Sequence, residues 1–386
     1  MNFYGYRRTD GSVGIRNHIL VMPGVICSAG AARKICERLP YATYLYNPNG
    51  CAQNHRDTEL TLEILSGMIA NGNIYGAVIV GLGCEMLQEN KYMEAIRKKT
   101  DKPVHYISIQ KEGGMKATVV KGMELVNQLK AEADQCQREL CDLSELILGM
   151  ECGGSDPTSG FSCNTVLGNV SDKLVDAGAT TVLSETPEAI GAEHILKKRG
   201  INEAIGQKLY DAVIQCERYY LEAGEDIRNI NPSPGNKAGG ITTLEEKSIG
   251  CIHKSGSRPF TDVISYGEKI RQKGLLFMDT TAYDVASTVA KIAGGAQIIV
   301  FTTGLGTPVG NAAAPVMKIT GNHDTAVRLA DIIDFDTSDS ITGIKTIDQL
   351  GDELLHDILE VCNGTLVNAE ENDISDMAIN QYSSYC

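Results

Sequence analysis

Three cysteines in the sequence, Cys51, Cys84 and Cys152, lie in loops that follow apolar runs, and each has glycine close beside it. Three thiolates from separate loops, with one coordination position open, suit iron or an iron–sulfur cluster. Cys27 and Cys251 could join such a site. The alternative for each cysteine is the common one, a small buried apolar side chain.

The segment ECGGSDPTSG at 151–160 adds hydroxyl and carboxyl groups to the thiol of Cys152. Glycine lets the backbone approach a bound group closely, so its amides can contact a carboxylate or a metal ligand. GLGCEM at 81–86 and GLGTPVG at 304–310 lack the spacing of a dinucleotide fingerprint, and no phosphate-binding P-loop motif occurs. These glycines therefore predict anion binding rather than nucleotide binding.

Two groups of residues are candidates for proton transfer. Glutamates and a histidine gather at 185–194 and could supply a general base, although a helix there would place some of them in solvent. Lys237 stands in the glycine- and proline-rich segment NPSPGNKAGG, which suggests a substrate contact or a catalytic ammonium. Lys318, between apolar residues, is the second choice because a buried charge needs a partner.

The elements that must position these residues follow an alternating pattern. Continuous apolar runs alternate with helix-like segments, which predicts an α/β fold with Rossmann-like parallel sheets and flanking helices. A polar stretch at 131–142 divides the chain into two α/β domains, 1–138 and 144–386. Ligands of such sheets bind beyond the carboxyl ends of the strands, where the candidate residues lie. The expected strands are 18–25, 41–46, 75–82, 103–109, 146–150, 180–184, 274–279 and 296–304, and the expected helices include 29–39, 91–100, 166–178 and 203–224.

Composition excludes several classes of function. Lys and Arg number 35 against 49 Asp and Glu, a net charge of −14, so the basic face that nucleic acid requires is not expected. No apolar run reaches about 18 residues and no signal peptide is visible, so a cytoplasmic protein with reduced thiols is expected. The polar tail after Asn363 is expected to pack poorly, and the terminal Cys386 to be idle.

Six segments together resemble the altronate dehydratase/galactarate dehydratase family, and the resemblance covers nearly the whole chain. It rests on YRRTDGSVGIRN (6–17), VGLGCE (80–85), ECGGSDPTSG (151–160), SETPEAIGAEH (184–194), NPSPGNKAGGITTLEEKSIGC (231–251) and FTTGLGTPVG (301–310).

The resemblance implies an iron-requiring hydro-lyase that removes water from a sugar acid, and a homo-oligomer. It implies a small β-rich domain ahead of this body, which could be a separate subunit here. Iron, as Fe²⁺ or a cluster, is assigned to Cys51, Cys84 and Cys152. The residues expected to transfer protons are Lys237, His194 and Glu85, and those expected to hold the substrate are Gly153, Gly154, Ser155, Asp156, Asn236, Thr302, Thr303 and Gly304.

Three departures from the family pattern concern the substrate. Leu305 stands where the family often has arginine, Asn47 where it often has histidine, and Cys163-Asn164-Thr165 where it often reads ANP. A missing arginine removes a bidentate carboxylate partner. The rival readings are a sulfo-lyase large subunit acting on sulfolactate, a non-catalytic iron-binding relative, and a nicotinamide oxidoreductase.

Overall fold

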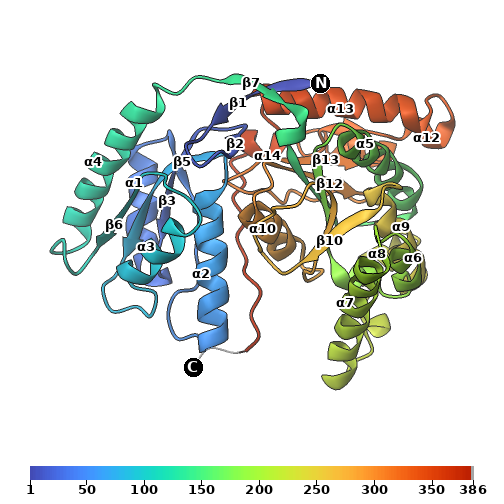
Figure 1. The fold of residues 1–386 in the computed structure, drawn as a ribbon, viewed down its shortest axis with the longest axis horizontal. Coiled ribbons are helices and arrows are strands. Elements are labelled where there is room, and N and C mark those ends of the chain that lie inside the picture. The colour runs from blue at the N-terminus through green and yellow to red at the C-terminus, as the bar shows by residue number, and fades with distance from the viewer. Residues whose placement is uncertain (384–386) are drawn as a thin grey trace.

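The computed structural model describes residues 1–383, which form two parallel sheets and one small antiparallel sheet. The predicted α/β class with parallel sheets is confirmed. Figure 1 shows the sheet of the N-terminal part on the left and the larger sheet of the C-terminal part on the right, with helices around both. The terminal Cys386 lies outside the described residues.

The first parallel sheet has the strand order β4-β3-β5-β6. Its strands are continuous apolar runs because helices cover both faces. Its strands are β3 (His18–Pro23), β4 (Ala42–Tyr44), β5 (Ile74–Gly81) and β6 (Val104–Ser108), and its helices are α1 (Ala29–Arg38), α2 (His55–Ala70), α3 (Glu89–Arg97) and α4 (Met115–Ala133).

The second parallel sheet has the order β10-β11-β9-β8-β12-β13-β14. In sequence order β8 comes first, the next strand β9 lies on one side of it, and β12, later in the chain, lies on the other. In order of position the strands are β10 (Phe260–Ile264), β11 (Gly274–Met278), β9 (Thr180–Leu183), β8 (Ile147–Cys152), β12 (Ile298–Thr303), β13 (Val316–Thr320) and β14 (Phe335–Asp336). Its helices are α5 (Asn164–Asp176), α6 (Glu193–Lys198), α7 (Glu203–Glu222), α8 (Pro234–Ala238), α9 (Leu244–Ile252), α10 (Asp284–Gly294), α11 (His323–Arg328), α12 (Asp339–Thr342), α13 (Ile347–Asn363) and α14 (Asn368–Glu371).

All eight expected strands form, with ends within a few residues of the prediction. The antiparallel strands β1 (Asn2–Arg7), β2 (Val13–Gly14) and β7 (Glu139–Asp142) were not predicted, because their sequences are polar or short. β7 belongs to the stretch read as a domain boundary. The sheets do fall on either side of that stretch, but β7 pairs with β1, so the division at 138 and 144 stays a prediction.

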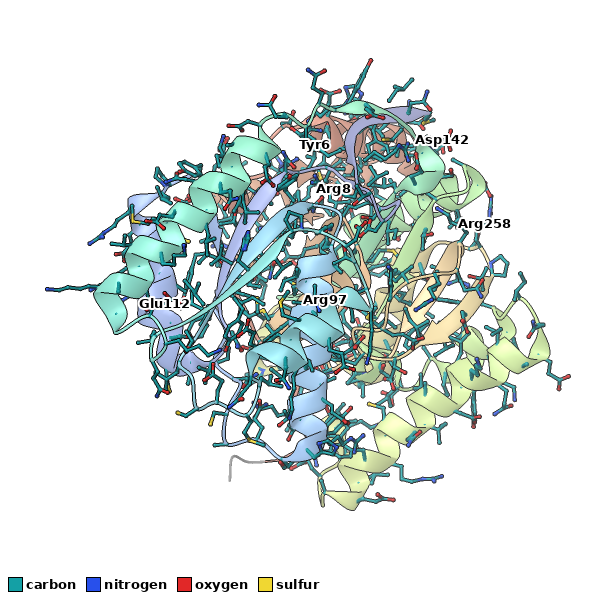
Figure 2. The ribbon with its side chains drawn as sticks, turned by 60° about the vertical axis from the view of Figure 1, so that its left-hand side comes forward. Tyr6, Arg8, Arg97, Glu112, Asp142 and Arg258 are labelled. Atoms are coloured by element: carbon teal, nitrogen blue, oxygen red, sulfur yellow. The ribbon has the colours of Figure 1, made fainter. Side chains whose placement is uncertain are left out.

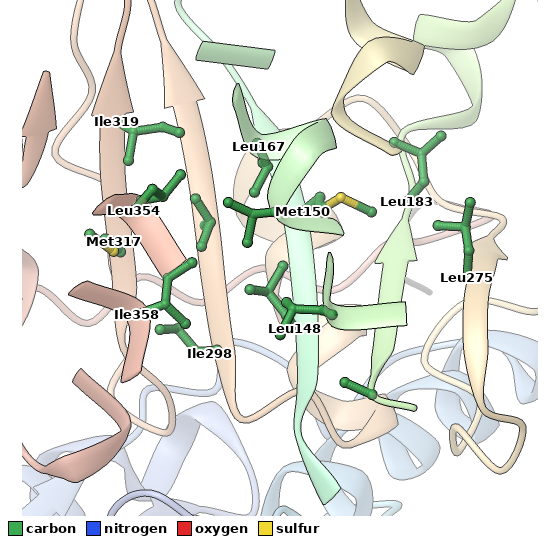
Figure 3. Close-up of a cluster of buried hydrophobic side chains, with 14 of the residues drawn as sticks. Leu148, Met150, Leu167, Leu183, Leu275, Ile298, Met317, Ile319, Leu354 and Ile358 are labelled. Atoms are coloured by element: carbon green, nitrogen blue, oxygen red, sulfur yellow. The ribbon is translucent and has the colours of Figure 1, made fainter. Parts of the chain in front are cut away.

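The largest core lies between the central strands of the second sheet and the helices α5 and α13. Figure 3 shows this packing, in which Leu148 and Met150 of β8 lie among Leu167 of α5 and residues of the neighbouring strands. All residues from Leu148 to Cys152 are buried, so both faces of β8 are covered, which fixes the strand and with it the position of the residue at its carboxyl end.

A second core joins the two parts of the chain, because α2 packs directly on α10. A Cβ added to Gly67 of α2 would lie 2.5 Å from the backbone oxygen of Ala293, so the helices meet backbone to backbone. This close contact makes the two parallel sheets one packed unit in the structure.

The motif at 6–17 ties the two parts together through its arginines. Arg8, which is buried near Tyr6 in Figure 2, donates hydrogen bonds to the backbone oxygens of Gly72 and Arg16. Arg16 forms an ion pair with Glu370 of α14 and donates to backbone oxygens of the C-terminal segment. The motif therefore has a structural role, because it joins the N-terminal and C-terminal parts of the chain.

The polar tail packs well, contrary to expectation. It runs in extended form beside α2 (Figure 1), and the Oγ of Ser375 donates to the backbone oxygen of Tyr44. Further along, the N–H of Tyr382 donates to a carboxylate oxygen of Asp57 at 2.7 Å. Hydrogen bonds of its polar groups, together with the burial of a few apolar side chains such as Val367 and Ile379, hold this segment, and a mainly polar composition did not reveal these contacts. No helix among residues 1–383 is long and apolar enough to cross a membrane.

Candidate active site

The site begins at Cys152, the last residue of β8. In an open parallel sheet, ligands bind beyond the carboxyl ends of the strands at the point where strand order reverses. β8 occupies that point, between β9 and β12. The prediction that the loop 151–160 belongs to a site at a strand end agrees with this topology.

The loop after β8 packs against the loop after β12. The backbone N–H groups of Gly304 and Leu305 both donate to the backbone oxygen of Gly154, at 3.1 and 2.8 Å. A Cβ added to Gly304 would lie 2.2 Å from the carboxyl carbon of Asp156. Glycine at 304 is thus required for this close approach, and it fixes the loop at 151–160.

Two backbone amides of this region remain available to a ligand. Four of the six amides in 153–155 and 304–306 donate to protein oxygens, whereas within residues 1–383 those of Gly154 and Ser155 do not. Gly154 adopts a left-handed φ of 57°. Consecutive amides beside a left-handed residue form a concave anion-binding turn, so these two groups can hold a carboxylate oxygen.

Two thiols and a carboxylate converge behind this loop. The sulfur of Cys152 lies 3.7 Å from that of Cys251 in α9 and 3.3 Å from a carboxylate oxygen of Glu185. The Lys254 ammonium lies 3.1 Å from the Cys251 sulfur and 2.5 Å from the other oxygen of Glu185. The hydrogen bond between Cys152 and Cys251, together with burial, raises the pKa of the Cys152 thiol well above its usual value.

Glu185 is held in a strained conformation directly after β9. Its φ of 67° and ψ of 59° are left-handed, which costs a residue with a Cβ of order 1–3 kcal/mol and is typical of functional sites. The N–H of Cys152 donates to its carboxylate at 3.2 Å. Burial alone would raise the pKa of Glu185, but the ammonium groups of Lys254 and Lys291 outweigh burial and hold that pKa below its usual range.

A second buried ion pair supports the first. Lys291 of α10 pairs with Glu151 of β8, and both side chains are fully buried. Lys291 also donates to the hydroxyls of Ser184 and Ser287. One carboxylate oxygen of Glu151 has no hydrogen-bond partner among the described residues, and burial raises the pKa of this group well above its usual value.

On the cavity side, Lys247 of α9 is the ammonium that the structure places at the site. Its Nζ donates to Glu188 at 2.9 Å, Asn231 at 3.0 Å and Asn236 at 3.2 Å. The Nδ2 of Asn236 donates to the backbone oxygen of Ser155 at 2.9 Å, which ties the loop at 231–251 to the loop after β8. One oxygen of the buried Glu188 carboxylate has no partner among residues 1–383.

Asp284, at the start of α10, brings a carboxyl group against the same loop. A Cβ on Gly153 would lie 2.1 Å from its Oδ2. Burial, and then the charges of Glu185 and Glu188, raise the pKa of Asp284 to about 7. A carboxyl with this pKa exchanges a proton easily near neutral pH.

Two adjoining cavities open at Cys152, which lines both. One, of about 390 Å³, is also lined by Gly154, Asn236, Lys247 and Asp284. The other, of about 210 Å³, is lined by Cys251, Lys247 and Ser155. Together the two cavities bring backbone amides, a carboxyl and an ammonium to the carboxyl end of β8.

The structure assigns different roles to the residues expected to hold the substrate. Gly153, Gly154, Ser155, Asp156 and Asn236 line the cavities. Thr302 and Thr303 are fully buried, and with Gly304 they hold the loops in place.

The residues expected to transfer protons lie elsewhere. Lys237 in α8 and His194 in α6 are exposed, and neither lines either cavity. Glu85 accepts hydrogen bonds from the Tyr106 hydroxyl at 2.6 Å and from the N–H of Leu82 at 3.0 Å, so it fixes its own turn after β5. Lys318, within β13, is fully buried and donates to two backbone oxygens.

The three cysteines do not form one ligand group. Among residues 1–383, the group of three or more ligand side chains whose atoms all lie within 4.8 Å of one another is Cys152, Glu185 and Cys251. Cys84 is exposed and Cys51 half-buried at the ends of strands in the other parallel sheet. These cysteines follow strands of one sheet and Cys152 ends a strand of another, so their similar positions after apolar runs do not bring them together. The prediction of one shared site for the three thiols was wrong for this reason.

Several site residues were missed or only noted as members of a loop. Glu151, Lys254 and Lys291 were not singled out, although Lys291 stands between apolar residues in TVAKIAG. A lysine in an apolar helix needs a buried partner, and that signal could have revealed the pair with Glu151.

Comparison with known proteins identifies the family of the chain. Residues 143–384 match the pattern described as D-galactarate/altronate dehydratase, C-terminal, and residues 5–134 match that of D-galactarate dehydratase/altronate hydrolase, second domain. The chain belongs to this dehydratase family. The resemblance drawn from the six motifs, and with it the prediction of an enzyme of the hydro-lyase kind, is confirmed.

Curated relatives cover nearly the whole chain. Altronate dehydratase of Bacillus subtilis is 37% identical over 98% of this chain and 77% of its own length. Galactarate dehydratase (L-threo-forming) of Escherichia coli is 36% identical over 94% of the chain and 73% of its own length. The (2R)-sulfolactate sulfo-lyase subunit beta of Chromohalobacter salexigens is 33% identical over 95% of the chain and 94% of its own length.

The buried thiols fit the iron that the family resemblance implies. Two thiolates on one tetrahedral ion, each at about 2.3 Å, lie about 3.8 Å apart, and the sulfurs of Cys152 and Cys251 are 3.7 Å apart. Thiolates select iron or zinc over magnesium or calcium. The donor set Cys152, Cys251 and Glu185 is therefore suited to such an ion.

Proposed function

We propose that the chain removes water from an altronate-type 2,3-dihydroxy acid and leaves a 2-keto-3-deoxy acid. The observation that carries the proposal is the cavity at the carboxyl end of β8, where free amides, an ammonium and a proton-exchanging carboxyl meet. Membership of a family whose curated relatives are altronate and galactarate dehydratases supports this reaction.

The substrate carboxylate is held by the loop after β8. The N–H groups of Gly154 and Ser155 donate to one oxygen of the substrate carboxylate. Lys247 gives up one of its contacts within the protein and donates to the second oxygen. Lys247 is the one cationic side chain among the described residues that line the 390 Å³ cavity. Leu305, which stands where the family often has arginine, also lines this cavity. A single carboxylate is matched by this lining, whereas a second charged end would have no partner. This favours a monocarboxylate of the altronate kind over a dicarboxylate.

Asp284 moves the proton. As a carboxylate it takes the proton from carbon 2, the electron pair of that bond forms the double bond to carbon 3, and the carbon 3 hydroxyl departs. The proton that Asp284 has taken completes the departing hydroxide to water, so one carboxyl balances the step. The enol product then tautomerises to the 2-keto acid. These roles replace the ones expected of Lys237, His194 and Glu85.

Cys152, Cys251 and Glu185 would hold iron, which would supply Lewis-acid polarisation of a substrate oxygen. Lys254 and the Glu151–Lys291 pair keep that donor set in place, because each ligand's charge or hydrogen-bonding capacity is then matched within the protein.

A second candidate function is elimination of sulfite from sulfolactate. The observation that favours it is the match to 94% of the length of a sulfo-lyase subunit beta. That relative's name, which calls it a subunit beta, also supports our proposal of a separate partner chain, small and β-rich by family resemblance. Self-association of this chain stays a prediction.

A substrate panel separates these functions. Anaerobically purified protein, supplied with Fe²⁺ and with a candidate small partner chain, is incubated with altronate, galactarate and sulfolactate, and 2-keto acid and sulfite are measured. We expect 2-keto acid from altronate and little from galactarate. Sulfite release from sulfolactate without altronate turnover would establish the second function, and turnover of none of the three would refute both.

A further inference from the structure

The carboxylate of Glu188 lies at the 390 Å³ cavity and is short of hydrogen-bond donors. Glu188 belongs to the 3₁₀ turn Thr186–Ala189 after β9, and its side chain is buried. Its Oε1 accepts hydrogen bonds from the Lys247 ammonium at 2.9 Å and from the Nδ2 of Asn231 at 3.1 Å. Its Oε2 has no partner among residues 1–383. A buried carboxylate oxygen without a donor costs free energy, so a ligand that supplies a donor is bound favourably.

Position distinguishes Glu188 from the other buried carboxylate of this kind. Among the described residues, one oxygen of Glu151 also lacks a partner. Glu151 lies within β8 and lines neither cavity of the site, whereas Glu188 lines the larger one. The missing donor of Glu188 can therefore come from a molecule in that cavity.

Binding of an acid makes the shortage of donors greater. Lys247 donates to Glu188, Asn231 and Asn236, so each of its three N–H groups has a partner within the protein. When Lys247 turns one N–H toward a substrate carboxylate, one of these acceptors loses its donor. The loss costs most at Glu188, because hydrogen bonds to a charged group are the strong ones. A hydroxyl of the substrate beside its carboxylate can supply the donor instead.

The hydroxyl nearest to the substrate carboxylate is the one on carbon 2. Lys247 contacts Glu188 in the structure and the substrate carboxylate in the proposed function, so Glu188 lies beside carbon 1 and its neighbour. A hydroxyl on carbon 2 can donate to Glu188, whereas a carbonyl there cannot, because a carbonyl oxygen only accepts. The dehydration converts the first group into the second once the enol has tautomerised.

We propose that Glu188 accepts a hydrogen bond from the carbon 2 hydroxyl of the acid and so distinguishes the hydroxy acid substrate from the keto acid product. The ligands that suit this position are carboxylates with a hydrogen-bond donor on the adjacent carbon. The keto product brings an acceptor against a negatively charged acceptor, so Glu188 favours its release. This role rests on the proposed function, because it takes Lys247 and the amides of Gly154 and Ser155 to hold the substrate carboxylate.

The substitution Glu188→Gln reverses the hydrogen-bonding character of this position and keeps its shape. The donors Lys247 and Asn231 both face Oε1, so the amide oxygen of glutamine takes that place and its NH₂ group takes the place of Oε2. Asn231 is held in its orientation, because its own Oδ1 accepts from Lys247 at 3.0 Å. A free acceptor is thereby replaced by a donor.

The test is equilibrium binding of acids that cannot be dehydrated. A 3-deoxyaldonic acid and the 2-keto-3-deoxy acid of the same chain length differ only at carbon 2, and neither has a hydroxyl on carbon 3. Isothermal titration calorimetry on the full chain, prepared as for the substrate panel, gives both dissociation constants. We expect the wild type to bind the hydroxy acid at least about tenfold more tightly than the keto acid. In Glu188→Gln this ratio should fall to about one or below, because the new donor faces the carbonyl.

Glu193→Gln is the matched control. Glu193 belongs to the same motif, lines neither cavity and accepts from the N–H of Gly191, so this variant should keep the wild-type ratio. Equal binding of the two acids by the wild type, or failure of the wild type to bind the hydroxy acid, would overturn the assignment without any variant. An unchanged ratio in Glu188→Gln, with folding checked by circular dichroism, would overturn it as well.

The outcome for Glu188 is separable from that of the proposed function. The expected ranking of the two acids without dehydration of altronate would leave Glu188 as a ligand-binding residue and refute the proposed reaction. Dehydration of altronate with no preference between the two acids would support the reaction and remove Glu188 from substrate recognition.

Discussion

Replacement of Asp284 by asparagine should stabilise the protein at high pH while it lowers kcat strongly. The pKa of this carboxyl is raised from 3.8 to about 7, chiefly by burial. The unfolded chain therefore releases the proton at lower pH than the folded chain does. Between these two values the folded state binds more protons, so stability falls as pH rises, and the penalty is complete above about pH 7.

The magnitude follows from the two pKa values. A difference of about 3 units corresponds to about 4 kcal/mol at pH 8, whereas at pH 5 the penalty is only about 1.5 kcal/mol, because there the folded carboxyl is still protonated. The asparagine side chain cannot ionise, so the variant avoids the penalty at both pH values. Asp284→Asn should therefore raise the free energy of unfolding by about 2.5 kcal/mol more at pH 8 than at pH 5.

Urea unfolding at these two pH values, followed by circular dichroism, measures this difference. Asp331→Asn, at an exposed aspartate, is the control and should shift stability equally at both pH values. In the dehydration assay, Asp284→Asn should lower kcat by about 10²–10⁴, the usual contribution of a general base. An equal stability change at both pH values would refute the raised pKa, and retained kcat would remove Asp284 from the mechanism.

Three further substitutions test the rest of the site. Lys247→Met should lower kcat/KM at least about 100-fold, because it removes the ammonium that contacts Glu188 and that we propose binds the substrate carboxylate. The matched variant Lys237→Met, at an exposed lysine, should keep kcat/KM within about twofold. The opposite ranking in steady-state kinetics would restore Lys237 to the site. Gly304→Ala should lower the free energy of unfolding by about 1–3 kcal/mol, because the added Cβ would lie 2.2 Å from the Asp156 carboxyl carbon. Unchanged urea unfolding of this variant would contradict the close packing of the loops after β8 and β12.

Local sequence determined the strands and the place of the site. Apolar runs at 146–150 and 296–304 form buried strands whatever their partners, because only a covered sheet can accommodate them. Residues that follow such a strand must lie at the carboxyl edge of a sheet. The family, the loop 151–160 and the contribution of Asn236 could therefore be predicted from motifs and strand ends alone.

Tertiary structure decided which of these residues meet. Cys84 and Cys152 follow similar strands, but strand order places them in different sheets, and no local pattern encodes that order. Lys237 and Lys247 are ten residues apart in one unusual loop, and only the packing of α9 against the site distinguishes the exposed ammonium from the buried one. Burial, charge and proximity arise between segments far apart in the chain. The sequence therefore determined the edge of the sheet at which the candidate site lies, and the fold decided which side chains line it.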